Sequence, residues 1–347
     1  MKELFPAFNP LSKDEVNQLW DNKSTAFVVD VNFLLNLYSF DSRNAEAILN
    51  LLEKQPVKDR LWLPYYVARA YNELKNEYIN QQINNIKGAI KDLNNLTDKI
   101  DSNRAHPYLP DSSCSSFHKM RDKLLNLLQQ DRHLLVGTLE QNSIDIDIDK
   151  LFPEDCIDQK CYDHAQVQEL CKRAELRYNR KKAPGYLSTL GAEDTLKYHQ
   201  YIVWKEMQRY AGKEHKNILM IRGYASSDWF NISDDRVIGP NPNIVDEFYS
   251  DTKRDYGQPQ TFYCMDGLGF IEICKEKELI HDDVYLQLQS QLKSPIQELT
   301  PNSNNIVQPN NNITNIEGNQ VKKEAKKSNN QKSTLLYDTT NTTDTTT

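Results

Sequence analysis

Short apolar runs alternate with long amphipathic segments along most of the chain. Four runs are typical of buried strands, because they are short and rich in β-branched and aromatic residues. They are FVVDV, RLWLP, NILMIRG and QTFYCMD, which start at residues 27, 60, 217 and 260. Between them, apolar residues recur every three to four positions, as on one face of a helix. Strands that alternate with helices predict an α/β fold in which helices flank a parallel sheet.

A long helical insertion is predicted after the second apolar run. A polar helix starts at YYVARAY, the segment HPYLPDSS interrupts it, and FHKMRDKLLNLLQQDRHLL begins an antiparallel partner. We therefore expect an inserted helical hairpin within about residues 72–180. The following SIDIDIDKLFPEDCID is interpreted as an irregular acidic loop, because it lacks the glycine and the distal glutamate of a calcium loop.

Both ends of the chain differ from its centre. SKDEVNQLW predicts a short capped helix, since Ser12 and Glu15 have the spacing of a capping box. The last part of the chain is dominated by Asn, Thr, Ser, Gln and Lys, a composition typical of disorder. The predicted organisation is a lead-in over residues 1–25, a folded domain over 26–290 and a disordered tail over 291–347.

Composition and charge indicate which partners and which compartment to expect for the protein. The net charge of −7 provides no overall basic field for nucleic acid, although it allows a local basic groove. The six cysteines form no CxxC pair and no common zinc spacing, so reduced thiols in a cytoplasmic protein are expected. Neither a signal-peptide core nor an apolar stretch of 18 residues occurs, so no membrane partner is predicted.

One acid stands at the end of the first predicted strand. In FVVDVNFLLNLY, Asp30 follows an apolar run and precedes a predicted helix. Ligands of open α/β sheets bind outside the carboxyl ends of the strands, so this carboxylate could face a binding crevice. It could equally cap the helix that follows. The position alone leaves both interpretations open.

Several stretches, taken in order, resemble the bacterial PIN-like nuclease domain, in a subgroup with a long helical insertion after the second strand. They are DVNFLLNLY, RLWLPYYVARAY, NRAHPYL, RYNRKKAPGY, YIVWKEMQRYA and NILMIRGYASSDWF, between about Phe27 and Ile273. The resemblance implies a parallel sheet flanked by helices. It also implies a carboxylate cluster that holds Mg²⁺ or Mn²⁺ and activates water to hydrolyse RNA or DNA. Such ions prefer oxygen ligands, and a pair of them stabilises the attacking and the leaving oxygen.

Most of the acids that this resemblance implies are missing. Asp30 and Asn32 match the motif at the strand tip, although Val31 replaces a hydroxyl residue between them. The other expected acidic positions are occupied by Ala70, Ser188, Gln200 and the pair Gly223–Tyr224. Asp228 is the remaining acid nearby, and Arg222 brings a positive charge to the place of a cation. The resemblance therefore implies a degenerate site with Asp30 as the matching metal ligand.

Nearby acids suggest an alternative set. Glu73 lies about one turn after Ala70 on the same helical face, and Glu193 precedes Gln200 by seven residues. A relocated site would then combine the catalytic candidates Asp30, Glu73, Glu193 and Asp228. On this alternative the chain is an active endoribonuclease that depends on Mg²⁺ or Mn²⁺.

A basic cluster precedes a Pro-Gly turn. The candidate nucleic-acid ligands in it are Arg173, Arg177, Arg180, Lys181 and Lys182, next to Lys172. The cluster is interpreted either as a phosphate-binding groove or as a solvated helix end whose cations favour the helix dipole. The leading hypothesis is a degenerate PIN-like module with little or no activity. It would bind RNA or single-stranded DNA, or regulate a protein partner, and would need no cofactor.

Overall fold

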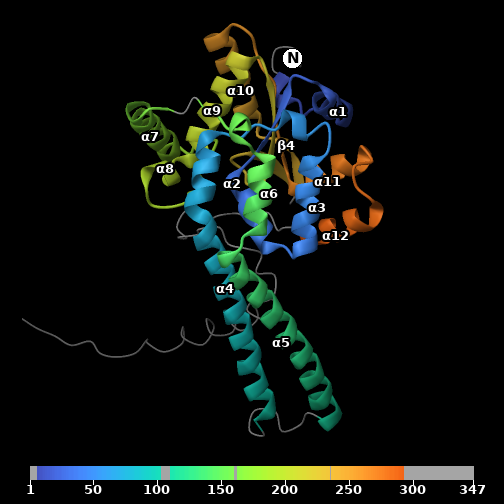
Figure 1. Ribbon diagram of the computed structural model, residues 1–347. Helices are drawn as coiled ribbons and strands as arrows, with labels where there is room; N and C mark the ends of the chain where they lie inside the picture. Colours follow the sequence, from blue (N-terminus) through green and yellow to red (C-terminus); the bar gives the residue numbers. More distant parts are fainter. Residues whose placement is uncertain (1–5, 103–109, 160–161, 235, 293–347) are drawn as a thin grey trace, which may run out of the picture. The chain divides into compact units, whose positions relative to one another are not determined.

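The computed structural model describes residues 6–102, 110–159, 162–234 and 236–292 (Figure 1). Nearly all of the predicted tail, from residue 293 on, lies outside the described residues. Within the described part of the chain, no helix combines the length and the apolar character that crossing a membrane requires.

Three parallel strands form the sheet of the described residues, in the order β1–β2–β5. These strands are β1 (Thr25–Val29), β2 (Asn217–Arg222) and β5 (Phe262–Asp266). The register runs from Thr25 opposite Asn217 in the first pair and from Ile218 opposite Phe262 in the second. The α/β class and the parallel sheet are therefore confirmed.

The second predicted strand, RLWLP, contributes only isolated bridges. Leu61 bridges Phe27 of β1, whereas Leu63 bridges Ile157. The segment ends at Pro64, whose nitrogen has no proton to donate to a ladder and which precedes α4 (Tyr65–Asp101). The chain therefore changes partners within three residues and never builds a full ladder beside β1.

Helices cover both faces of the sheet, and aromatic side chains mark each face. Residues in register point to the same side of a sheet. On one side Phe27 lies 4.8 Å from Trp20 of α1 (Lys13–Asp21), measured between ring centroids. On the other, Phe262 lies 5.0 Å from Trp204 of α9 (His199–Glu214) and 5.3 Å from Phe248 of α10 (Pro242–Tyr256). The strands are buried on both faces and therefore appear as unbroken apolar runs in the sequence.

The remaining elements lie around this core and in the insertion. The helices near the sheet are α1 (Lys13–Asp21), α2 (Val31–Asn36), α3 (Ser42–Glu53), α9 (His199–Glu214), α10 (Pro242–Tyr256), α11 (Gly267–Glu276) and α12 (Asp282–Leu292). The others are α5 (Asp111–Glu140), α6 (Ser143–Leu151), α7 (His164–Asn179) and α8 (Asp194–Lys197). Short 3₁₀ helices occur at Pro6–Phe8, Leu37–Ser39, Lys58–Arg60 and Glu154–Cys156.

The prediction of a capped first helix is confirmed. The capping box of α1 is present, since Ser12 and Glu15 exchange bonds between side chain and backbone. The segment after β2 forms an antiparallel hairpin of β3 (Phe230–Ser233) and β4 (Arg236–Pro240).

The helical hairpin is also present: α4 and α5 pack against each other as antiparallel helices (Figure 1). Near its tip, His118 Nε2 lies 2.9 Å from Asp101 Oδ1.

The interpretation of SIDIDIDKL as an irregular loop is wrong, because this segment forms α6. Asn142 caps the helix by accepting a hydrogen bond from the Asp145 N–H at 2.9 Å. Ile148 and Leu151 are buried, whereas Ile146 is exposed. The alternation of Ile and Asp hides the helical spacing of the residues that reach the core.

Candidate functional site

Asp30 is a buried carboxylate at the carboxyl end of β1. Its Oδ1 accepts hydrogen bonds from the backbone N–H of Phe33 at 2.7 Å and of Gly223 at 2.9 Å. The first bond caps α2. Its Oδ2 lies 3.6 Å from Nη2 of Arg222. The side chain therefore caps a helix and joins the ends of two neighbouring strands.

Gly223 allows these strand ends to approach each other closely. A Cβ atom at this position would lie 2.5 Å from the backbone carbon of Asn32 and 2.6 Å from the nitrogen of Phe33. Asn36 Nδ2 also donates to the Gly223 carbonyl at 3.0 Å. The chain after β2 thus packs directly on the first turn of α2, where a side chain would not fit.

Arg222 is the last residue of β2, and its guanidinium group is fully buried. Its Nη1 donates to Oε1 of Gln200 at 3.0 Å. The guanidinium carbon lies 4.2 Å from the ring centroid of Trp229, a cation–π contact. Burial raises the pKa of Asp30, and the positive charge of Arg222 opposes that shift. The pair stabilises two buried charges that would each be costly alone.

His199, which starts α9 beside Gln200, is buried near the same cation. Burial and the charge of Arg222 lower the pKa of its imidazole to about 3. The ring is therefore neutral at physiological pH.

Asp228 is buried and holds two loops together. Its Oδ2 accepts from the backbone N–H of Gly185 at 2.8 Å and of Leu187 at 3.4 Å. Its Oδ1 accepts from the hydroxyl of Ser226 at 2.6 Å. Both carboxylate oxygens are thus engaged inside the protein.

The other two candidate acids lie on the surface. Glu73 Oε1 pairs with Nε of Arg69 at 2.6 Å along α4, whereas Ala70 beside it is part of the core. Glu193 is exposed and precedes α8. The structure therefore brings Asp30 and Asp228 to the buried surroundings of the β2 end and leaves Glu73 and Glu193 outside it.

One acid at the strand ends escaped the sequence analysis. Asp266 ends β5 directly opposite Arg222 in the sheet register. Its Oδ1 accepts from the Gly269 N–H at 2.8 Å and caps α11, and burial raises its pKa. The signal was available, since QTFYCMDG ends an apolar run with an acid, as FVVD does. An acid therefore follows β1 directly, a base ends β2 and an acid ends β5.

These residues do not fit a two-metal centre. Among the described residues, no group of three or more His, Cys, Asp or Glu side chains is placed to hold a metal ion. Asp30 Oδ1 already accepts two N–H groups, and the Arg222 guanidinium lies 3.6 Å from Oδ2. A divalent cation at this place would be repelled by the arginine and would lack the oxygen ligands that Mg²⁺ requires.

Much of the basic cluster is engaged in ion pairs. Arg177 makes a bidentate contact with Glu247, with distances of 2.9 and 3.1 Å from Nη1, and Lys182 reaches the same carboxylate at 3.2 Å. Arg173 Nε pairs with Glu169 at 2.9 Å along α7. The exposed end of the cluster is formed by Lys172, Arg180 and Lys181.

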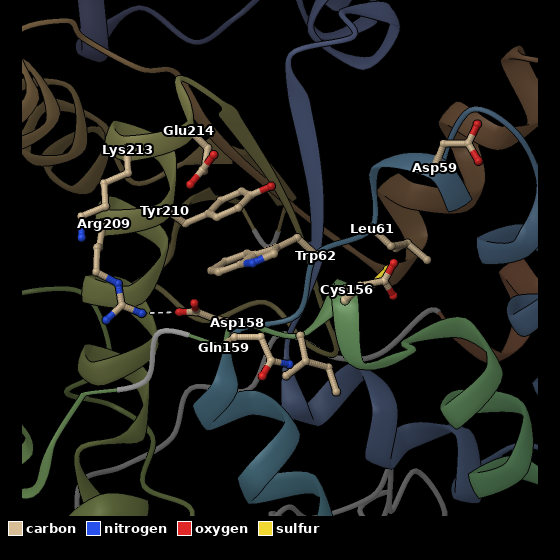
Figure 2. A pocket seen from close by; sticks show the side chains of 12 residues that line it. Asp59, Leu61, Trp62, Cys156, Asp158, Gln159, Arg209, Tyr210, Lys213 and Glu214 are labelled. Atoms are coloured by element: carbon tan, nitrogen blue, oxygen red, sulfur yellow. Dashed lines mark hydrogen bonds and ion pairs between the residues drawn. The ribbon is translucent and has the colours of Figure 1, made fainter.

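A pocket of about 350 Å³ lies beside the last turns of α9 (Figure 2). Trp62 stacks on Tyr210 at its wall, with 3.9 Å between ring centroids, and Arg209 pairs with Asp158. Burial raises the pKa of the Cys156 thiol, so the thiol is protonated at neutral pH and is a weak nucleophile. Because α9 starts near Arg222 and ends near the start of β2, this pocket and the strand-end cluster lie at opposite ends of the sheet.

Glu206 of α9 is a second buried acid that the sequence analysis missed. Its Oε2 accepts from the backbone N–H of Tyr66 at 3.2 Å, in the first turn of α4. Pro64 precedes that helix and has no side-chain acceptor, so Glu206 caps α4 from another helix. Burial is the main cause that raises its pKa to about 8. No local signal identifies it, because the two residues are 140 positions apart.

Glu206→Gln is expected to stabilise the protein at alkaline pH and to leave it nearly unchanged at pH 5. The pKa rises from 4.5 to about 8 on folding, so the folded state keeps a proton that the unfolded state releases. The free energy of unfolding of the unmodified protein therefore falls as the pH rises from 4.5 to about 8, and replacement by glutamine removes this loss. Urea denaturation at pH 5 and pH 9 measures the gain, on the order of a few kcal/mol. Glu175→Gln, at an exposed position of α7, is the control. An equal effect of Glu206→Gln at both pH values would contradict the expectation.

The described elements define a class of protein. A parallel sheet covered by helices, with an acid after the first strand and a helical hairpin before the second, is an α/β architecture with its chemistry expected at the strand ends. The chain belongs to the PIN-like domain family, because it matches the family described as PIN like domain over residues 26–244, more than half of its length. Neither the search of curated proteins nor the search of solved structures returned a match. The protein therefore has a nuclease-family fold.

Proposed function

We propose that this protein is a PIN-like domain with a degenerate metal site, which acts as a nucleic-acid-binding or regulatory module and has little or no cleavage activity. The observation that carries the proposal is the buried pair of Arg222 and Asp30. The buried guanidinium group of Arg222 lies beside Asp30, where a PIN-like nuclease would be expected to hold its metal ions. Asp30 remains as the matching ligand, and Asp228 is committed to backbone and hydroxyl donors.

RNA or single-stranded DNA is the proposed ligand, and the end of α7 is the proposed contact. Lys172, Arg180 and Lys181 expose their side chains there, next to Arg173 and Lys182. Clustered cations bind phosphates and release counterions, which makes such binding weaken with salt. Arg177 has a different part in the proposal: its ion pair with Glu247 holds α7 against α10 and so positions the cluster.

A cleavage assay tests the loss of activity. Labelled RNA and single-stranded DNA are incubated with the protein in Mg²⁺ and in Mn²⁺, beside Asp30→Asn and beside the double variant Glu73→Gln/Glu193→Gln. We expect no cleavage above background from any of the three. The double variant changes only surface residues, so it is expected to fold even if Asp30→Asn does not.

Either of two outcomes would overturn the degenerate-site proposal. Cleavage that is lost in Asp30→Asn, with the fold retained by circular dichroism, would show a working metal ligand. Cleavage that is lost in the Glu73/Glu193 variant would instead support the active endoribonuclease with relocated acids, with Mg²⁺ or Mn²⁺ as its cofactor.

Arg180→Glu/Lys181→Glu is expected to weaken binding of single-stranded RNA at least tenfold. Each lost phosphate contact should also lower the slope of log K against log salt by about 0.7. Electrophoretic mobility shifts at several salt concentrations measure both quantities. The control is Lys87→Glu/Lys91→Glu, which makes the same charge change on an exposed face of α4. Equal losses in both variants, or no binding by the unmodified protein, would contradict a site at the end of α7.

A further inference from the structure

The helix α5 exposes a stripe of apolar side chains along one side of the hairpin. Met120, Leu124, Leu127 and Leu134 are 67%, 44%, 49% and 62% exposed. Their spacings of four, three and seven residues place them on one helical face. None of the described residues of α5 is buried although the helix has 30 residues, and Leu135 is only partly buried against the core. Exposed apolar residues gathered in this way mark an interaction surface.

The stripe is distinct from the face that α5 turns toward α4. The half-buried residues Arg121, Leu125, Leu128 and Leu135 recur at helical spacing and form that inner face. The stripe residues precede these positions by one, so they lie along one flank of the inner seam.

The other helix of the hairpin extends the same apolar area. The contact between His118 of α5 and Asp101 of α4 shows which residues of the two antiparallel helices lie side by side. Counting back from it places Leu96 of α4, which is 46% exposed, opposite residues 123 and 124 of α5. Leu96 precedes the buried Thr97 by one, as Leu124 precedes Leu125. In antiparallel helix pairs, such equivalent flanking positions share one side of the seam.

We infer that a second copy of this chain covers the stripe, through an antiparallel contact of α5 with α5 of the partner around a twofold axis near Leu127. The spacing of Met120, Leu127 and Leu134 is self-complementary about Leu127, whereas Leu124 faces Gln130 of the partner. Met120 and Leu134 are each seven positions from Leu127, so each faces the other across the axis. A twofold contact requires this kind of self-matching surface. Two hairpins joined in this way form a four-helix bundle.

The charges beside the stripe match in the same alignment. Lys123 and Asp131 are each four positions from Leu127 and lie on the same side of α5 as the stripe. An antiparallel pair centred on Leu127 therefore places Lys123 opposite Asp131 of its partner. Opposite charges at the rim fix register and partner choice more than affinity.

The charge balance also favours a second copy over a lipid surface. α5 carries four basic and four acidic side chains, whereas helices that lie on anionic membranes are rich in Lys and Arg. The stripe from residue 120 to 134 is about 21 Å long at 1.5 Å per residue. With Leu96 beside it, the area is suited to a modest, concentration-dependent dimer rather than an obligate one.

Sedimentation equilibrium of the full chain over a range of concentrations tests the proposal. The unmodified protein is expected to form a dimer, and Leu127→Glu is expected to raise the dissociation constant at least tenfold, because two carboxylates then meet at the axis. The control is Leu176→Glu, at an exposed apolar position of α7, which is expected to leave the dimer unchanged. Circular dichroism verifies that both variants are folded.

Charge reversal tests the antiparallel register. Lys123→Glu alone is expected to weaken the dimer severalfold, and Lys123→Glu/Asp131→Lys is expected to restore it. A monomeric unmodified protein, a dimer that Leu127→Glu leaves intact, or a double variant as weak as the single one would overturn the inference. Flotation of a monomeric chain with anionic phospholipid vesicles would instead assign the stripe to a membrane surface.

Discussion

Replacement of Arg222 by alanine is expected to lower the free energy of unfolding by about 3–5 kcal/mol, the usual result of removing one partner from a buried ion pair. Arg222 is fully buried and lies 3.6 Å from Asp30 Oδ2. The substitution also removes the donor to Gln200 and the cation over Trp229. Asp30 would then keep its two N–H donors but face no opposing charge.

The loss caused by Arg222→Ala is expected to grow with pH. Burial already raises the pKa of Asp30 above 3.8, and Arg222 is the largest influence that lowers it. Without Arg222 the folded-state pKa rises further, whereas the unfolded-state value stays the same. The folded state then binds more protons than the unfolded state above about pH 4, and its stability falls as pH rises.

Urea denaturation at pH 5 and pH 8 measures both effects. The control is Arg236→Ala, at an exposed position of β4, which should change stability little. The double variant Asp30→Asn/Arg222→Ala removes both charges, so its loss should be smaller than the sum of the two single losses. Strict additivity in this cycle would show that the two side chains do not interact.

Asp228→Ala is expected to cost about 2–4 kcal/mol, because it leaves buried donors without an acceptor. Gly185, Leu187 and Ser226 all donate to this carboxylate, and it is fully buried. The loop that contains Gly185 would lose its attachment to the segment between β2 and β3. Local opening of that loop is expected in addition to the global loss of stability.

Trypsin digestion under native conditions measures the local effect separately. Lys181 and Lys182 immediately precede the loop that Asp228 holds, so cleavage after them should accelerate in Asp228→Ala. The control is Asp246→Ala, which removes an exposed acid from α10. If both variants were cleaved at the rate of the unmodified protein, Asp228 would not be the group that secures the loop.

The two predictions share a functional meaning. Asp30 lies beside a guanidinium and accepts hydrogen bonds from two backbone N–H groups, one of them in the first turn of α2. These contacts contribute to the stability of the fold. Folding stability, rather than catalysis, is therefore the property we expect Asp30 to control.

Local sequence patterns predicted the elements whose signals are short in range. The unbroken apolar runs identified β1, β2 and β5, and the spacing of Ser12 and Glu15 identified the start of α1. The same reasoning failed for α6, where alternation of Ile and Asp hid a helical face, and for RLWLP, where Pro64 prevents a full strand. Asp266 was missed although its signal matched that of Asp30.

The sequence by itself determined the α/β class and the acid at the tip of the first strand. Only the tertiary structure decided what those residues do. Asp30 accepts a bond from a residue 193 positions away, and Glu206 caps a helix 140 positions away. Periodicity and capping patterns extend over a few residues, whereas packing brings distant strand ends together. The partners and the protonation of these buried acids therefore follow from the assembled core.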